Sequence, residues 1–214
     1  MDYINIALAK GRLADKAYIM LKKAGLGDCI DPNSRKLIFK DDSKKISFIY
    51  VKPSDVVTYV QNGVADLGVA GKDVILESDS DVYEILDLGF GKCKFAVAGL
   101  KGEKIYKKDE VLRVATKYPK VSKRFFAEKE QRIKLIKLNG SVELAPLVGL
   151  SDVIVDLVET GNTLKVNGLE IIEDMFEVSA KLICNRVSYR FKYDRISKLL
   201  DKLKRLEGQC CEDN

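Results

Sequence analysis

The feature that most constrains the fold is a repeated unit, in which a short apolar run leads through a turn into an amphipathic helix pattern. The first unit has an apolar run at residues 3–9, a turn at 10–12 and a helix pattern at 13–25. Runs of the same two kinds alternate again through residues 112–164. Strands that alternate with helices predict parallel or mixed sheets with helices on their faces, so we expect an α/β protein.

The remaining segments fit the same class. We expect a strand pair around the polar residues 41–45, a helix with Pro53 in its first turn, one long strand at 170–185 and a closing amphipathic helix at 188–207. The apolar stripe of that last helix indicates core packing rather than a partner interface. No Ser/Gly/Pro-rich linker separates domains, and long strands are the expected connectors. We therefore predict a discontinuous first domain, 1–91 plus 179–214, and a second domain inserted at 92–178.

The chain contains no histidine. This absence excludes the commonest general base, Ser/His and Cys/His nucleophile pairs, and the commonest zinc ligand. Any chemistry must use carboxylates, lysine, arginine, hydroxyl groups and backbone amides.

The charge balance and the cysteine content limit the classes of partner and the cellular compartment. Lysine and arginine number 37 against 32 acids, and the resulting +5 is spread along the chain, which favours small phosphorylated ligands over a DNA duplex. The five cysteines form no C-x-x-C motif and include the adjacent pair Cys210 and Cys211. The N-terminal segment fits neither a secretory signal nor a membrane span. We expect a reduced, cytoplasmic protein that binds neither nucleic acid nor membrane.

One segment, VDLVETGNTL at 155–164, carries a candidate site. An apolar strand runs into Thr160 and Gly161, and the backbone amides that follow, with two threonine hydroxyls, suit an anion. Asp156 and Glu159 supply acceptors for ribose hydroxyls, or Glu159 orients a metal-bound water. Together these groups describe a phosphorylated ribose. The alternative is a threonine that caps a helix after an ordinary βα turn.

A longer stretch, GSVELAPLVGLSDVIVDLVETGNTL at 140–164, resembles the signature of the ATP phosphoribosyltransferases, which open histidine biosynthesis. The segments LAKGRL, VADLGVAGKDVILE and RVATKYP resemble the same family and occur in the family's order. The resemblance covers essentially the whole chain. The residues that match the signature are Glu143, Gly149, Asp156, Thr160, Gly161, Thr163 and Leu164.

The resemblance is to the short form of the family, which lacks an extra C-terminal regulatory domain. It implies a two-domain fold like that of type II periplasmic binding proteins, with the active site in the cleft between the domains. The implied reaction joins N1 of the adenine of ATP to C1 of phosphoribosyl pyrophosphate, with Mg²⁺ carried by the pyrophosphate rather than held directly by the protein. The implied partners are a second copy of the chain, in a homodimer, and a regulatory subunit related to histidyl-tRNA synthetase.

We assign residue roles on this basis. The 5-phosphate is expected at Thr160, Gly161, Asn162, Thr163 and Leu164, with Asp156 and Glu159 near the ribose. Lys10, Gly11 and Arg12 follow the first strand, where an open α/β sheet binds ligands, and are expected to hold a phosphate chain. Their alternative role is a polar turn before a helix.

Arg35 and Lys52 are the candidates for catalytic charge stabilisation of the pyrophosphate, although each alone also fits a solvated surface charge. Lys52 departs from the arginine expected there and lacks its two-pronged geometry. The further nucleotide-binding candidates are Asp66, Gly71, Asp73, Tyr118 and Glu143. For Asp73 the alternative is a helix cap, and for Tyr118 it is packing.

Two other functions stay open at this point. A ligand sensor with a binding-protein fold would hold a phosphorylated sugar without chemistry. A different pentosyltransferase would use the same ribose-phosphate loop with another nitrogen base as acceptor.

Overall fold

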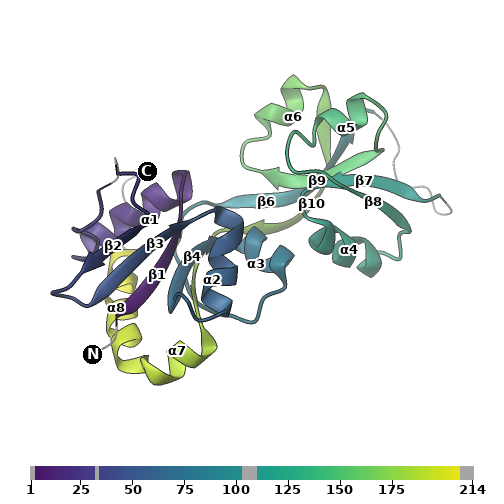
Figure 1. The fold of residues 1–214 in the computed structure, drawn as a ribbon. Coiled ribbons are helices and arrows are strands. Elements are labelled where there is room, and N and C mark those ends of the chain that lie inside the picture. Colours follow the sequence, from purple (N-terminus) through teal and green to yellow (C-terminus); the bar gives the residue numbers. More distant parts are fainter. Residues whose placement is uncertain (1–2, 32–33, 103–109, 208–214) are drawn as a thin grey trace. The chain divides into compact units, whose positions relative to one another are not determined.

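The computed structural model describes residues 3–31, 34–102 and 110–207. The chain divides into two compact units, Met1–Gly91 with Ser179–Asn214, and Lys92–Val178 (Figure 1). The backbone passes from one unit to the other twice, after Gly91 and after Val178. The cysteine pair at 210 and 211 lies outside the described residues.

The first unit is built on a six-stranded sheet in the order β2-β3-β1-β4-β11-β5. The three neighbouring strands β3, β1 and β4 are parallel, so their carboxyl ends meet at one edge. We call this the carboxyl edge of the first sheet. The strands are β1 (Ile4–Ala9), β2 (Ile38–Asp41), β3 (Ile46–Val51), β4 (Leu67–Gly71), β5 (Tyr83–Asp87) and β11 (Ala180–Cys184).

Alternation along β1 explains why both faces of this sheet are covered. Ile4, Ile6 and Leu8 enter one hydrophobic cluster, with residues from α1 (Arg12–Lys23) and α8 (Tyr193–Glu207). Ala7 and Ala9 enter the other, with residues from α2 (Val56–Gln61) and α3 (Lys72–Ser78). The short 3-10 turn η1 (Pro53–Asp55) precedes α2, with Pro53 in its first position as predicted.

Small residues let α2 approach the sheet closely. A Cβ atom built on Gly68 of β4 would lie 2.7 Å from Val60 Cγ2 and 2.8 Å from Val56 Cγ1, both on α2. Such distances are shorter than any real carbon contact, so glycine is required at this position for α2 to pack where it does.

The predicted single strand at 170–185 is wrong. The structure has two strands there, β10 (Leu169–Val178) and β11 (Ala180–Cys184), and they belong to different sheets. Both halves alternate in the same way, because period-two alternation reports which side chains share a face and not which sheet the strand joins.

The predicted closing helix is also divided. It forms α7 (Arg186–Phe191) and α8, with Lys192 between them. Asn185 caps α7, since its side-chain oxygen accepts hydrogen bonds from the backbone N–H groups of Val187 and Ser188. The apolar stripe of α8 packs in the core as predicted, with Ile196, Leu199, Leu200 and Leu203 all buried.

The second unit holds a five-stranded sheet in the order β10-β6-β9-β7-β8. Strand β7 runs parallel to both β8 and β9, and β6 runs antiparallel to β9 and β10. We call the end at which β7, β8 and β9 finish the carboxyl edge of the second sheet. The strands are β6 (Cys93–Leu100), β7 (Leu112–Thr116), β8 (Ile133–Lys137), β9 (Val153–Val158) and β10.

Helices lie on both faces of the second sheet. Helix α4 (Pro119–Glu128) covers one face, and α5 (Leu144–Leu147) with α6 (Asn162–Val166) covers the other (Figure 1). The cluster under α5 and α6 is built largely from small or branched residues of β6, β7 and β9. Both units are therefore helix-covered mixed sheets, which confirms the predicted α/β class.

None of the helices in the described ranges is long and apolar enough to cross a membrane.

Candidate functional site

The predicted phosphate loop lies at the carboxyl edge of the second sheet, directly after β9. Glu159 and Thr160 are exposed, and Gly161 adopts the left-handed conformation with φ 74° and ψ 3°. The N–H of Asn162 points to Thr160 Oγ1 at 3.4 Å, a long hydrogen bond. Helix α6 begins at Asn162, and its first N–H groups have no partner within the helix.

Leu164 anchors this loop. Its side chain is only 5% exposed and packs into the cluster under α5 and α6, while Thr163 beside it is exposed. The loop therefore presents threonine hydroxyls and backbone amides to solvent on a fixed base. That combination can bind an oxyanion.

Asp156 lies two residues before the end of β9 and is half-buried. Side chains alternate along a strand, so Asp156 faces the same side as Ile154 and Val158, the side that α5 and α6 cover. The structure thus brings the carboxylate of Asp156 and the loop to one face of one strand end. Glu159 follows the strand in the exposed part of the loop.

Two further segments reach the same edge. Thr116 ends β7 and is fully buried; its Oγ1 donates to the Val155 carbonyl at 2.7 Å and accepts from the Tyr118 N–H at 2.9 Å. Glu143 is half-buried in the segment that follows β8, immediately before α5. Thr116 was not predicted, although a lone polar residue at the end of an apolar strand is a signal that could have identified it.

Tyr118 does not fit its predicted role against adenine. Its side chain is 6% exposed, and its ring packs edge-on against Phe95 with centroids 4.9 Å apart. A ring that is covered in this way offers no face on which a base can stack. Tyr118 instead closes the core where α4 begins.

In the first unit, three predicted segments meet at the carboxyl edge. Lys10 follows β1, Lys52 follows β3, and Gly71 ends β4, and β1 lies between the other two strands. The N–H of Lys10 donates to the Val51 carbonyl at 3.2 Å, which ties two of the segments together. The side chains of Lys10 and Lys52 are both exposed. This edge carries fixed positive charge suited to a phosphate chain.

A steric constraint explains why residue 71 is a glycine. Its φ of −68° suits any residue, but a Cβ atom there would lie 2.1 Å from Asp73 Oδ1. The carboxylate of Asp73 therefore folds back over the Gly71 backbone at the start of α3. Asp73 lies in the first turn of α3, but the N-cap is Gly71 and no side-chain hydrogen bond caps the helix.

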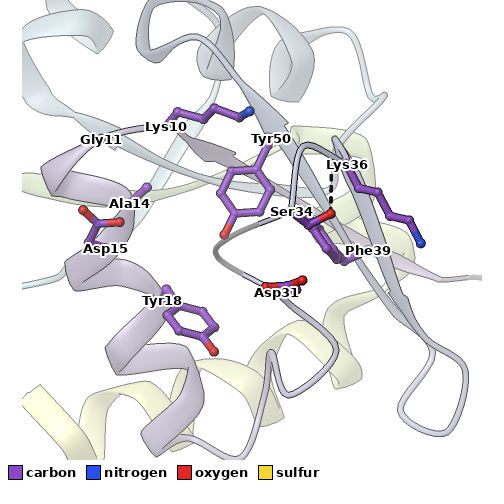
Figure 2. Close-up of a pocket in the computed structure, with 10 residues that line it drawn as sticks. All are labelled: Lys10, Gly11, Ala14, Asp15, Tyr18, Asp31, Ser34, Lys36, Phe39 and Tyr50. Atoms are coloured by element: carbon purple, nitrogen blue, oxygen red, sulfur yellow. Dashed lines mark hydrogen bonds between the residues drawn. The ribbon is translucent and has the colours of Figure 1, made fainter.

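A cavity of about 200 Å³ opens beside Lys10 and Gly11 (Figure 2). It lies between α1 and the segment that leads into β2, with Tyr50 between them (Figure 2). Arg12 and Arg35 are exposed and are absent from the described lining, although Arg35 stands between two lining residues. The described lining is Lys10, Gly11, Ala14, Asp15, Tyr18, Asp31, Ser34, Lys36, Phe39 and Tyr50.

Tyr50 sets the chemistry of this cavity. Burial raises the pKa of Tyr50, and the nearby Tyr18, Asp15 and Cys29 raise it further. The phenol therefore stays neutral and can donate a hydrogen bond. Tyr18 and Tyr50 were not predicted as site residues; a signal was present in α1, where Tyr18 stands one helical turn after the small Ala14.

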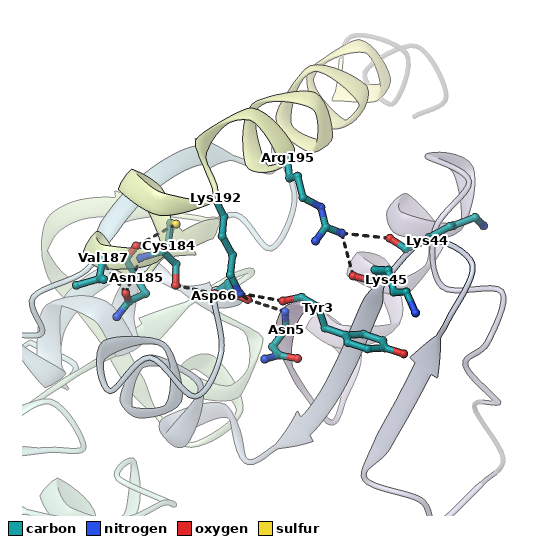
Figure 3. Close-up of polar contacts among 11 residues, drawn as sticks. Tyr3, Asn5, Lys44, Lys45, Asp66, Cys184, Asn185, Val187, Lys192 and Arg195 are labelled. Atoms are coloured by element: carbon teal, nitrogen blue, oxygen red, sulfur yellow. Dashed lines mark hydrogen bonds and ion pairs between the residues drawn. The ribbon is translucent and has the colours of Figure 1, made fainter. Parts of the chain in front are cut away.

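The position of Asp66 does not suit its predicted nucleotide-binding role. The residue lies at the amino end of β4, away from the carboxyl edge, and is 3% exposed. It accepts from the Asn5 N–H at 2.8 Å, Ser188 Oγ at 2.6 Å and Lys192 Nζ at 2.9 Å (Figure 3). These partners occupy the carboxylate, so Asp66 joins β1 and β4 to the helices α7 and α8 and lies apart from the nucleotide-binding candidates at the carboxyl edge.

The chain matches the family model described as HisG, ATP phosphoribosyltransferase, over residues 52–205. A protein of Clostridioides difficile named ATP phosphoribosyltransferase is 66% identical over 208 residues, which cover 97% of this chain and 100% of that protein. A protein of Lachnoclostridium phytofermentans with the same name is 50% identical, covering 95% of this chain and 97% of that protein.

Comparison with solved structures supports the same family. A chain of the ATP phosphoribosyl transferase (HisG:HisZ) complex of Thermotoga maritima superposes with a TM-score of 0.85 and 37% identity, covering 96% of this chain and 99% of that chain. The periplasmic aliphatic sulphonate binding protein of Escherichia coli superposes with a TM-score of 0.60 and 12% identity, covering 97% and 73%. The second likeness confirms the expected type II periplasmic-binding-protein fold. By sequence and by structure, the chain belongs to the ATP phosphoribosyltransferase family.

Proposed function

We propose that this protein transfers the phosphoribosyl group of phosphoribosyl pyrophosphate to N1 of the adenine of ATP and releases pyrophosphate, the first step of histidine biosynthesis. The observation that carries the proposal is the 66% identity, over 97% of the chain, to a protein named for that activity. The bond from C1 of ribose to the pyrophosphate oxygen breaks, and a bond from C1 to N1 forms with inversion.

The residues of this chain suit such a reaction. Adenine N1 carries no proton, so its attack needs no strong base, and a protein without histidine meets that requirement. The main demands are precise positioning and positive charge on the departing pyrophosphate. The proposed sources of that charge are Lys10 and Lys52, at the carboxyl edge of the first sheet, and Arg35. The side chain of Arg35 is exposed, and its two sequence neighbours line the cavity.

The phosphoribosyl group is assigned to the second unit. The amides and hydroxyls of 160–164 take the 5-phosphate, and Asp156, on the side of β9 that α6 covers, accepts from the ribose hydroxyls. Glu159 is placed to assist at the ribose, and Glu143 reaches the same edge. The support for this assignment is that one strand end carries both an anion cradle and an acceptor carboxylate.

The nucleotide is assigned to the carboxyl edge of the first unit. Lys10, Gly11 and Arg12 hold the phosphate chain, while Gly71 and Asp73 approach the ribose or the adenine amine. The 200 Å³ cavity adjoins Lys10 and is smaller than the roughly 300–1,000 Å³ of sites for drug-sized ligands, so it accommodates part of a nucleotide.

Magnesium is proposed to arrive with the pyrophosphate. In the described ranges, no group of three or more Asp, Glu and Cys residues gathers into a metal site. Magnesium usually keeps several waters and substrate phosphates as ligands, with only one or two carboxylates, which is the physical basis for an ion carried by the pyrophosphate. The ion would neutralise charge on the leaving pyrophosphate.

We also propose the assembly that the Thermotoga maritima complex suggests. That structure is described as a HisG:HisZ complex, and one chain of it superposes on this chain over nearly the whole length of both. A regulatory subunit related to histidyl-tRNA synthetase, a homodimer of this chain and a cytoplasmic location complete the proposal.

One alternative has a specific observation in its favour. The likeness to periplasmic binding proteins, at 12% and 17% identity, shares the fold and leaves room for a sensor without chemistry. A second alternative keeps the donor site but uses another nitrogen base.

The test is pyrophosphate release by the purified chain with ATP, Mg²⁺ and phosphoribosyl pyrophosphate, with and without a HisZ-type subunit. Release that requires both substrates, accompanied by a near-ultraviolet absorbance change from N1-substituted adenine, supports the transferase. Donor binding without release under either condition supports the sensor. Release with another base, but not with ATP, supports the different acceptor.

A further inference from the structure

A second cavity in the first unit lies at the amino ends of β1 and β3, the edge opposite the candidate nucleotide site. Its volume is about 250 Å³. Ile4 and Ile46, the first paired residues of these two strands, form part of its floor. The described lining residues are Ile4, Leu26, Lys44, Ile46, Arg195, Lys198, Leu199 and Lys202.

The lining divides into two chemical classes. Four side chains are apolar and buried, and four are cationic, while no acidic residue belongs to the described lining. Three of the four cations come from α8 and one from the turn between β2 and β3. The cavity therefore has an apolar floor beneath a positive rim.

Two of the rim cations are held in place by the fold. Arg195 extends from α8 and donates to the backbone carbonyls of Lys44, at 3.2 Å, and Lys45, at 2.9 Å (Figure 3). Lys44 Nζ pairs with Asp28 at 3.2 Å. The Arg195 contacts fix α8 against the β2–β3 turn, and the Lys44 pair ties that turn to the segment after α1, so the cavity is formed before any ligand binds.

The other two cations are available. Lys198 and Lys202 stand four residues apart on α8, which places them on one face of the helix. Both are exposed, and neither makes a hydrogen bond or ion pair with another residue of the described ranges. Like charges at this spacing repel each other, so an anion between them would relieve the repulsion.

We propose that this cavity binds a small amphipathic anion, whose apolar part covers the floor and whose carboxylate or phosphate group lies between Lys198 and Lys202. The volume is below the roughly 300–1,000 Å³ of sites for drug-sized ligands, which selects a small molecule. An apolar floor and unpaired cations together favour a ligand that has both characters over a simple ion or a simple hydrocarbon.

The test is calorimetric titration of the full chain with hexyl phosphate, hexanoate, inorganic phosphate and hexanol. Hexyl phosphate and hexanoate should bind at least about tenfold more tightly than hexanol or inorganic phosphate, because only they combine both groups. Equal affinity for hexyl phosphate and inorganic phosphate would overturn the proposal, as would no binding. The pair of head groups separates a preference for phosphate from one for carboxylate.

Paired variants locate the site. The double variant Lys198→Ala, Lys202→Ala should weaken hexyl phosphate binding by about tenfold or more, from two lost ion pairs. The double variant Lys204→Ala, Arg205→Ala removes the same charge from exposed positions of α8 outside the described lining, and should leave binding unchanged. If both double variants weaken binding equally, the effect is one of general charge. If neither weakens binding, the ligand lies elsewhere, for example at the phosphate loop. Either result overturns the proposal.

Discussion

The carboxyl edges of the two sheets are both proposed to bind phosphate groups, and they present different chemistry. In the first unit, cationic side chains follow two neighbouring strands, at Lys10 and Lys52, beside a cavity with tyrosine in its wall. In the second unit, a single loop after β9 presents amides and hydroxyls. Side-chain charge suits an extended phosphate chain that varies in position, whereas a backbone cradle suits one phosphate held at one point.

Two aspartates sharpen this comparison, because both adjoin parallel strands. Asp66 stands at the amino end of β4, is buried and is fully engaged by protein partners. Asp156 stands near the carboxyl end of β9 and is half-buried beside the loop. The two carboxylates thus lie at opposite ends of their strands, and the proposed ligand-binding role falls to Asp156, at the carboxyl edge.

The largest expected effect tests the structural aspartate. Asp66→Ala should lower the free energy of unfolding by about 3–5 kcal/mol, because it leaves Lys192 Nζ without its buried partner. Urea unfolding followed by circular dichroism measures this loss. A loss within about 0.5 kcal/mol, typical of a surface position, would show that the carboxylate is free for another role.

Asp156→Asn should act on the reaction instead. We expect kcat/KM for phosphoribosyl pyrophosphate to fall by about 10- to 100-fold, since a charged acceptor for ribose hydroxyls is lost. Steady-state kinetics measures it. The control is Asp174→Asn, which alters an exposed acid of the same unit that pairs with Lys94. Equal kinetics in both variants would remove Asp156 from the donor site.

A pair of glycines tests the backbone cradle. Gly161→Ala and Gly168→Ala each place alanine at a positive φ, 74° and 72°, and should each cost about 1–2 kcal/mol of stability. Neither new Cβ meets a clash, because the shortest contact is 3.7 Å, from Gly161 to Val158. Only Gly161→Ala should raise KM for the donor. A similar rise for Gly168→Ala would show that general strain in α6, rather than the loop, controls binding.

The smallest expected effect is a pH-dependent change in stability at Asp87, in the first unit. Burial tends to raise the pKa of Asp87, but hydrogen bonds from Lys181, Gly89 and Ser179 outweigh it and hold the pKa below 3.8. A lowered folded pKa contributes stability above the unfolded value, and this stability is lost as pH falls through the folded value. Asp87→Asn should therefore be slightly less stable than the native protein at pH 7.

The exposure of Asp87 keeps this difference small, since its side chain is 48% exposed. The stability difference between the native protein and Asp87→Asn should close as pH falls below about 3.8, in urea unfolding measured across the acid range. A difference that persists below that range would show that shape, not charge, accounts for the effect. In the second unit, Arg113 and Asp152 form an ion pair that is comparable to the one between Lys181 and Asp87.

The sequence by itself determined the local structure. The apolar run at residues 3–9 predicted a strand, and in the structure β1 is buried on both faces. The loop after β9 was also readable, because the strand, the glycine and the threonines that form it are contiguous in the chain. Such features depend on neighbours only a few residues away, and periodicity reports those neighbours directly.

The tertiary structure alone decided which pieces meet. Alternation through 170–185 is continuous, yet the chain changes sheets at Ser179, because backbone pairing with another strand is invisible in side-chain periodicity. Lys192, at the break between α7 and α8, contacts Asp66, more than a hundred residues away in sequence. The cavity beside Lys10 likewise joins α1 to the segment before β2. Each of these depends on long-range packing, which assigns strand ends, and therefore functional roles, to residues that look alike in the sequence.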